Sequence, residues 1–154
     1  MIRVFYTSDL TNGVDRSMIE NILCASRKNN ERDDITGFLI LHENKIMQLL
    51  EGPEDEVEAC VKRIAQDPRH TTTGRIMKSM ATQRAFKGWS MGCANIEDMS
   101  PAVSDCVRDL YQVADRVEEA RSQEIHWESQ SAGRLIRSFL TQFSEFNRRN
   151  GVAA

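Results

Sequence analysis

The chain has 154 residues, enough for one well-formed hydrophobic core and short for two, so we expect one domain with an appendage. Lys and Arg total 20 against 23 Asp and Glu, and the formal net charge of -3 disfavours nucleic acid or an anionic membrane as a partner. No segment approaches the ~20 apolar residues of a membrane helix. The amino end, MIRVFYTSDL, lacks the layout of a signal peptide, so we expect a cytoplasmic protein.

The cysteines bear on metal binding and redox chemistry. The sequence has four of them, at positions 24, 60, 93 and 106, with no Cys-x-x-Cys pair and no histidine at ligand spacing. This pattern disfavours both a zinc site and a redox dithiol. We therefore expect no metal.

The first two expected elements are a strand and a helix. Residues 2–7 are rich in strand formers and place alternate side chains on opposite faces. Asp15 or Ser17 is a suitable N-cap for a helix that ends near residues 26–30. The apolar stripe of this helix, at helical spacing, consists of Met18, Ile19, Ile22, Leu23 and Ala25.

A hairpin of two apolar strands is expected next. The segments ITGFLIL (residues 35–41) and KIMQLLE (residues 45–51) are separated by His42-Glu43-Asn44. Gln48 lies in the middle of the second strand, where the side chains on both faces are otherwise apolar, so its amide is expected to be buried. A buried amide without partners costs roughly 1–3 kcal/mol, so other groups must hydrogen-bond to Gln48.

A second helix and two more strands are expected after this hairpin. Gly52-Pro53 followed by three acidic residues is a strong helix start, and Asp67-Pro68 stops that helix. Extended segments follow around residues 75–82 and 89–94. The order β-α-β-β-α-β-β predicts an α+β fold, a ferredoxin-like sheet with one extra strand.

Two helices are expected at the carboxyl end of the chain. One begins at Ser100-Pro101 and the other covers about residues 131–148, and both carry apolar residues at spacings of three and four. They are able either to cover the sheet face that the first two helices leave open or to pair with another subunit. We therefore interpret residues 1–95 as the core domain, 96–148 as a helical extension and 149–154 as a tail.

Polar residues on this scaffold form a candidate ligand site. In a split βαβ sheet the first and third strands are neighbours, so Tyr6 is a suitable hydrogen-bond partner for Gln48. Asn29 and Asn30, expected just past the first helix, offer amides to a polar planar ligand. The basic residues able to hold a phosphate or ribityl tail are Lys28, Arg63 and Arg69.

Six segments share their order and spacing with a known family. They are FYTS (residues 5–8), SRKNN (26–30), ITGFLIL (35–41), MQLLEG (47–52), RIAQDPRH (63–70) and RAFKGWSMG (84–92). Together they resemble the BLUF domain, the blue-light sensor using FAD, over residues 1 to about 95. The sequence departs from that family at Ile46, where phenylalanine is common, and at His42, where tyrosine is frequent.

The resemblance implies a noncovalently bound flavin, FAD or alternatively FMN or riboflavin, inserted between the first two helices. Tyr6 is then the electron and proton donor, Gln48 the amide that bridges tyrosine and flavin, and Asn30 a ligand of the ring's carbonyl edge. The residues that the resemblance places near the flavin or its tail are Arg63, Asp67 and His70. Trp89 and Met91 are both candidates for the neighbour of Gln48, and the sequence leaves open which of them is inside.

The implied mechanism is a rearrangement of hydrogen bonds. Electron transfer from Tyr6 inverts the hydrogen-bond preferences around Gln48, whose amide then adopts its other orientation or tautomer. We interpret the protein as a non-enzymatic photoreceptor that signals to a separate partner protein through the sheet and the C-terminal helices, with self-association expected as well. The alternatives are a flavin-dependent redox enzyme and a ferredoxin-like interaction module without a cofactor.

Overall fold

The computed structural model describes residues 1–11 and 15–99, and beyond them positions 101, 103–105, 107–109, 138 and 141. For residues 71–77 it describes the backbone alone. The elements in chain order are β1 (Ile2–Leu10), α1 (Arg16–Arg32), β2 (Thr36–His42), β3 (Lys45–Gly52), α2 (Glu54–Ala65), β4 (His70–Met80), β5 (Gly92–Asn95) and the short 3₁₀ helix η1 (Ile96–Asp98).

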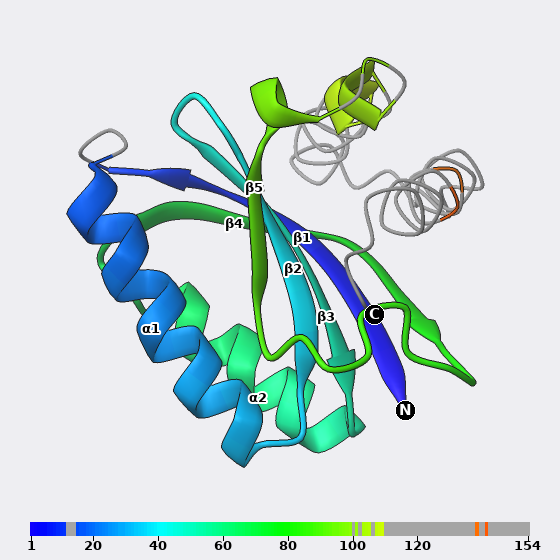
Figure 1. Ribbon diagram of the computed structural model, residues 1–154. Helices are drawn as coiled ribbons and strands as arrows, with labels where there is room; N and C mark the ends of the chain where they lie inside the picture. Colours follow the sequence, from blue (N-terminus) through cyan, green and yellow to red (C-terminus); the bar gives the residue numbers. More distant parts are fainter. Residues whose placement is uncertain are drawn as a thin grey trace, which may run out of the picture.

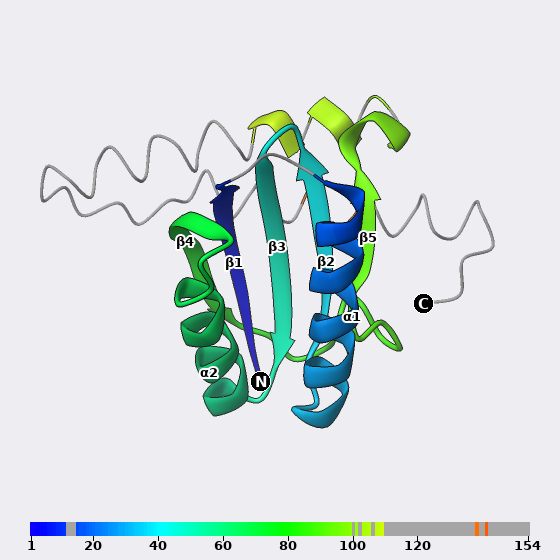
Figure 2. The ribbon, with the colours of Figure 1, turned by 90° about the vertical axis from the view of Figure 1, so that its left-hand side faces the viewer.

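A five-stranded sheet forms the centre of the protein, with strand order β4-β1-β3-β2-β5. Neighbouring strands are antiparallel except β2 and β5, which are parallel. Helices α1 and α2 lie side by side across one face of the sheet (Figure 1, Figure 2). The predicted α+β, ferredoxin-like order with one extra strand is therefore confirmed.

The end of α1 lies later in the sequence than predicted. Asp15, one of the two expected candidates, is the N-cap and accepts a hydrogen bond from the amide of Ser17. The helix continues past Asn30, and the N–H of Asp33 still donates to the carbonyl of Asn29 at 3.0 Å. The placement of Asn29 and Asn30 just past the helix was therefore wrong, because both lie within its final turns.

The strand boundaries also differ from the prediction. β1 extends to Leu10 and β4 begins as early as His70, because these two residues still pair with each other. β5 begins only at Gly92, so residues 89–91 belong to irregular backbone instead of to a strand. Gly88, which precedes them, has a φ of 77°, a conformation that disrupts strand geometry and that glycine adopts readily.

Alternation of side chains along the strands creates two hydrophobic clusters on opposite faces of the sheet. The cluster under the helices includes Val4 of β1 and Val57 of α2. The cluster on the other face includes Phe5, the sequence neighbour of Val4, together with Leu49 of β3. Both faces of the central strands are therefore buried, as predicted for the strand that carries Gln48.

Part of the expected helical extension lies against the face that α1 and α2 leave open. The described positions between 101 and 109 are helical, and Val103 and Val107 belong to the hydrophobic cluster of that face. These contacts favour coverage of the open face by the first extension helix. Positions 138 and 141 are also helical, and the rest of both expected helices lies outside the described residues.

A buried carboxylate anchors the connection between β4 and β5. Glu51, near the end of β3, is 0% exposed and forms an ion pair with Arg3 at 2.5 Å. Its oxygens also accept hydrogen bonds from the N–H groups of Ala85 at 2.9 Å and Phe86 at 3.2 Å. The ring of Phe86 stacks on Phe38 with a centroid distance of 5.5 Å. The connection is thus fixed to the sheet face opposite α1 and α2.

Candidate functional site

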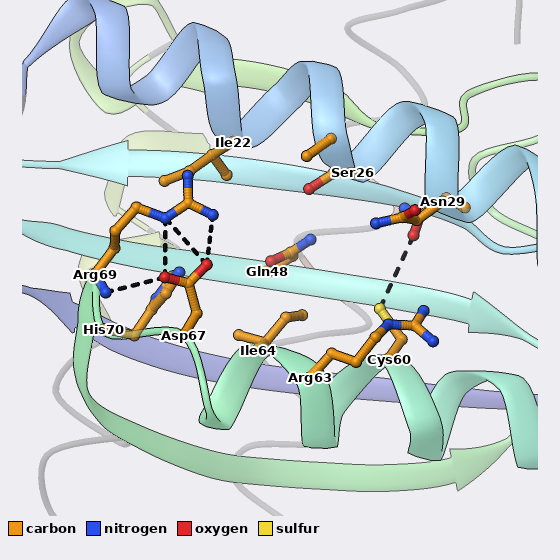
Figure 3. A pocket seen from close by; sticks show the side chains of 12 residues that line it. Ile22, Ser26, Asn29, Gln48, Cys60, Arg63, Ile64, Asp67, Arg69 and His70 are labelled. Carbon is orange, nitrogen blue, oxygen red and sulfur yellow. Dashed lines mark hydrogen bonds and ion pairs between the residues drawn. The ribbon is translucent and has the colours of Figure 1, made fainter.

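A cavity of about 110 Å³ lies between α1 and α2, over the middle of β3 (Figure 3). Its apolar lining includes Ile22 of α1 and Ile64 of α2, which face each other across the gap. The predicted site residues that line it are Asn29, Asn30, Gln48, Arg63, Asp67, Arg69 and His70. Residues far apart in the sequence are therefore brought together around one cavity.

Four predicted site residues do not line this cavity. Lys28 is exposed on α1, and its role stays a prediction. Tyr6 and Met91 are buried and both contact Gln48, one through a hydrogen bond from its hydroxyl and the other through its sulfur. Trp89 belongs to the hydrophobic cluster on the opposite face of the sheet.

The amide of Gln48 is held by two buried side chains. Tyr6 lies directly opposite Gln48 in the β1–β3 register, and its hydroxyl donates a hydrogen bond to Gln48 Oε1. Gln48 Nε2 in turn donates to Met91 Sδ at 3.4 Å. Burial raises the pKa of Tyr6 well above its ordinary value, so the phenol stays neutral and remains a donor. The predicted Tyr6–Gln48 pair is thus present, and the amide points its oxygen at the phenol.

Met91 and Trp89 lie on opposite faces although they are two residues apart. Met91 is 2% exposed and packs in the cluster under the helices, whereas the half-buried Trp89 ring lies 5.6 Å from Phe38. In a regular strand two such residues would share a face. They do not, because β5 begins only at Gly92. The question left open by the sequence is answered in this structure: Met91 is the neighbour of Gln48.

Asn30 connects the cavity to the segment that precedes β5. It is 1% exposed, and its Nδ2 donates to the carbonyl oxygen of Ser90 at 2.7 Å. Its Oδ1 lies 3.9 Å from the thiol sulfur of Cys60, which can donate a weak hydrogen bond across the cavity. Asn30 is therefore fixed from two sides, while its neighbour Asn29 is half-buried at the cavity wall.

Charged residues at the two ends of the cavity are paired, and Figure 3 shows the Arg69–Asp67 pair at one of these ends. Arg63 Nη2 lies 2.7 Å from Asp33 Oδ2, at the end of α1. Arg69 Nε donates to Asp67 at 2.9 Å, and this hydrogen bond is the main reason that the pKa of Asp67 falls to about 2. His70 Nδ1 lies 2.7 Å from the Ser8 hydroxyl, and burial lowers the pKa of its imidazole.

Two residues of the site were missed by sequence reasoning. Cys60 was interpreted as a small hydrophobic residue in the buried stripe of the second helix, but its side chain also lines the cavity opposite Asn30. Asp33 is 8% exposed and binds both Arg32 and Arg63. The signal available for Asp33 was an acidic residue directly after a helix, a common surface pattern that does not identify a tertiary partner.

Comparisons with known proteins identify the family of this chain. The family model described as "BLUF: Sensors of blue-light using FAD" matches residues 1–92. The blue light- and temperature-regulated antirepressor BluF of Escherichia coli (strain K12) is 31% identical over 83 residues, covering 54% of this chain and 21% of that protein. The photoactivated adenylate cyclase subunit beta-like protein ST- of Euglena gracilis is 33% identical over 110 residues, covering 68% of this chain and 13% of that protein. The chain thus spans about a fifth, or less, of the length of these relatives.

Solved structures share the fold. A bacterial light-regulated adenylyl cyclase is 29% identical with a TM-score of 0.65, over 81% of this chain and 36% of that one. The dark-state structure of the BLUF protein BlrB has a TM-score of 0.71 at 21% identity, over 94% of this chain and 96% of that one. Because the family model covers more than half of the chain, this protein belongs to the BLUF family of sensors of blue light using FAD.

Proposed function

We propose that this chain is a blue-light receptor in which a flavin binds between α1 and α2 and a rearrangement around Gln48 is the signal. The observation that carries the proposal is the buried series Tyr6–Gln48–Met91, which reaches the cavity through the amide of Gln48. An amide offers a donor at one end and an acceptor at the other, so turning it over exchanges what it presents to each neighbour. Such a group has two states of similar packing and different hydrogen bonding.

The residues at the cavity fit a flavin head group. Ile22 and Ile64 offer apolar walls for a flat ring, while the amides of Asn29, Asn30 and Gln48 match the carbonyl and N–H groups along one ring edge. The cavity of about 110 Å³ is smaller than the ~300–1,000 Å³ that ligand pockets usually have. Binding therefore requires side chains at the mouth to move apart. Family membership supports FAD as the cofactor, with FMN and riboflavin as further candidates.

Tyr6 and Gln48 carry the proposed chemistry. A bound flavin excited by blue light supplies an electron acceptor. With flavin bound, Tyr6 would donate to it an electron and the hydroxyl proton that it holds at Gln48 Oε1, and both would return to Tyr6 as the photocycle closes. Gln48 then turns its amide so that Nε2 faces Tyr6 and Oε1 faces Met91, and the hydrogen bond to Met91 Sδ is lost because a thioether sulfur only accepts. Burial of Tyr6 and Gln48, 0% and 4% exposed, keeps water from offering competing hydrogen bonds.

The output proposed for the protein is binding to a separate partner, without catalysis by this chain. The printed names of its relatives describe an antirepressor and cyclase subunits, so effectors differ within the family. We place the flavin-binding unit at residues 1–95, the helical extension at 96–148 and a tail at 149–154. Contacts of Val103 and Val107 with the sheet support the extension as the element that binds a partner or a second copy of the chain. We place this binding in the cytoplasm. No helix among the residues described is long and apolar enough to cross a membrane.

The first experiment is a visible absorption spectrum of the purified protein in darkness and after blue illumination. We expect a flavin spectrum that moves to longer wavelength and recovers in the dark. A flavin band that only bleaches would instead indicate redox enzymology. A colourless protein that takes up no added flavin would indicate an interaction module.

The amide mechanism is tested by Gln48→Leu. This variant should bind flavin but lose the light-induced shift, because leucine has neither donor nor acceptor. The matched control is Gln66→Leu, at an exposed amide in the C-cap of α2, which should shift normally. A normal shift in Gln48→Leu would refute the mechanism.

A further inference from the structure

Two side chains of α1 hold successive carbonyl groups of the segment that precedes β5. Asn30 Nδ2 donates to the carbonyl oxygen of Ser90 at 2.7 Å, and Arg27 Nε donates to that of Met91 at 3.0 Å. Arg27 and Asn30 are three residues apart, so they lie on the same side of the helix. Helix α1 is therefore hydrogen-bonded to the backbone at the point where the Met91 side chain points toward Gln48.

Packing alone does not confine this segment on its outer side. A hollow of about 330 Å³ lies beside it, lined by Arg27 and by the residues from Gly88 to Cys93. The backbone of residues 89–91 lies outside β5, and one bond joins it to β2, from the N–H of Gly37 to the carbonyl of Trp89 at 3.1 Å. The hydrogen bonds from α1 therefore add to the inner packing and to this one bond in holding the segment in place.

We propose that Arg27 is a positioning residue, which fixes the backbone of Met91 to α1 so that Met91 Sδ stays within reach of Gln48 Nε2. The inference rests on the proposed function, because it concerns the partner of the switching amide. Arg27 itself does not line the cavity between the helices and touches neither Gln48 nor Tyr6 through a hydrogen bond among those the structure describes. Its effect is exerted through the Met91 carbonyl.

The first test follows the side chain of Met91 in the flavin-loaded protein by methionine methyl NMR, with the signal assigned through Met91→Leu. In Arg27→Ala we expect the Met91 methyl signal to shift or broaden, and in Arg27→Lys we expect partial recovery because lysine is also a donor. The control is Arg16→Ala, which removes an exposed arginine at the other end of α1. An unchanged Met91 signal in Arg27→Ala would overturn the proposal.

The second test labels Cys93 in darkness with N-ethylmaleimide and quantifies the modified peptide by mass spectrometry. Burial raises the pKa of Cys93, and the nearby Arg27 partly offsets this. Losing the charge alone would therefore slow labelling, whereas opening of the segment would speed it. We expect labelling about fivefold faster in Arg27→Ala, the factor that corresponds to the net contribution of one hydrogen bond.

The outcomes separate the two proposals. If Cys93 is labelled no faster in Arg27→Ala than in the wild type, and the wild type shows a normal light-induced shift, the role of Arg27 is overturned and the photoreceptor function stays intact. A wild-type protein without any light-induced shift would overturn the proposed function, whatever the labelling rate.

Discussion

Replacing Glu51 by alanine is expected to destabilise the protein strongly. The carboxylate is 0% exposed, forms an ion pair with Arg3 and accepts hydrogen bonds from the N–H groups of Ala85 and Phe86. Its removal leaves Arg3, whose side chain is 18% exposed, without this carboxylate partner. It also leaves the buried N–H of Phe86 without its acceptor. Each buried group left unsatisfied costs roughly 1–3 kcal/mol.

The expected total is about 3 kcal/mol. Broken buried ion pairs usually cost about 3–5 kcal/mol. We take the lower end because Ala85 is exposed, so water can replace one of the lost hydrogen bonds. Glu51→Gln keeps one acceptor oxygen and should lose less than Glu51→Ala.

Urea unfolding followed by circular dichroism measures this loss through linear extrapolation. The control is Glu20→Ala, which removes the carboxylate that pairs with Arg16. The Glu20 side chain is 65% exposed, so its loss should change stability by less than ~1 kcal/mol. A loss below ~1 kcal/mol for Glu51→Ala would refute the view that this carboxylate fixes the β4–β5 connection.

Two further predictions concern the phenol and the mouth of the cavity. Tyr6→Phe removes the donor to Gln48 Oε1 and should retain flavin but block the light-induced shift, which flash spectroscopy would detect; a normal photocycle would contradict the role given to Tyr6. Asp67 has its pKa lowered to about 2 in the folded protein, so its stabilising pairing with Arg69 is present above the unfolded pKa of about 4 and is lost as the pH falls toward 2. The stability difference between wild type and Asp67→Asn should therefore shrink over this range, and a difference independent of pH would refute the pairing.

Local sequence patterns predicted the sheet and the pair at its centre. In the split βαβ order the first and third strands are neighbours, and this placed Tyr6 beside Gln48 before any contact was known. The end of α1 was misplaced because Asn29 and Asn30 suit helix ends, whereas the helix continues to Arg32.

The residues that sequence patterns could not place depend on tertiary contacts. The backbone from Gly88 to Met91 is irregular, so the rule of alternation fails there and could not assign Met91 to the inner face. The Asp33–Arg63 ion pair joins two helices, and no spacing along the chain specifies it.

The placement of Trp89 and Met91 on opposite faces has a mechanical consequence. The short run between them crosses from one side of the sheet to the other at its edge, just before the first residue of β5. Bringing the indole to the amide of Gln48 would therefore require the main chain to turn over, since no rotation of side chains reaches across. Gly92 leaves room for the indole on its present face, because a Cβ at this position would lie 2.2 Å from a carbon of the Trp89 ring. Replacing the Met91 thioether by the Trp89 indole beside Gln48 would thus require local unfolding of the backbone at this edge. Its rate would be set by the opening of β5 from β2.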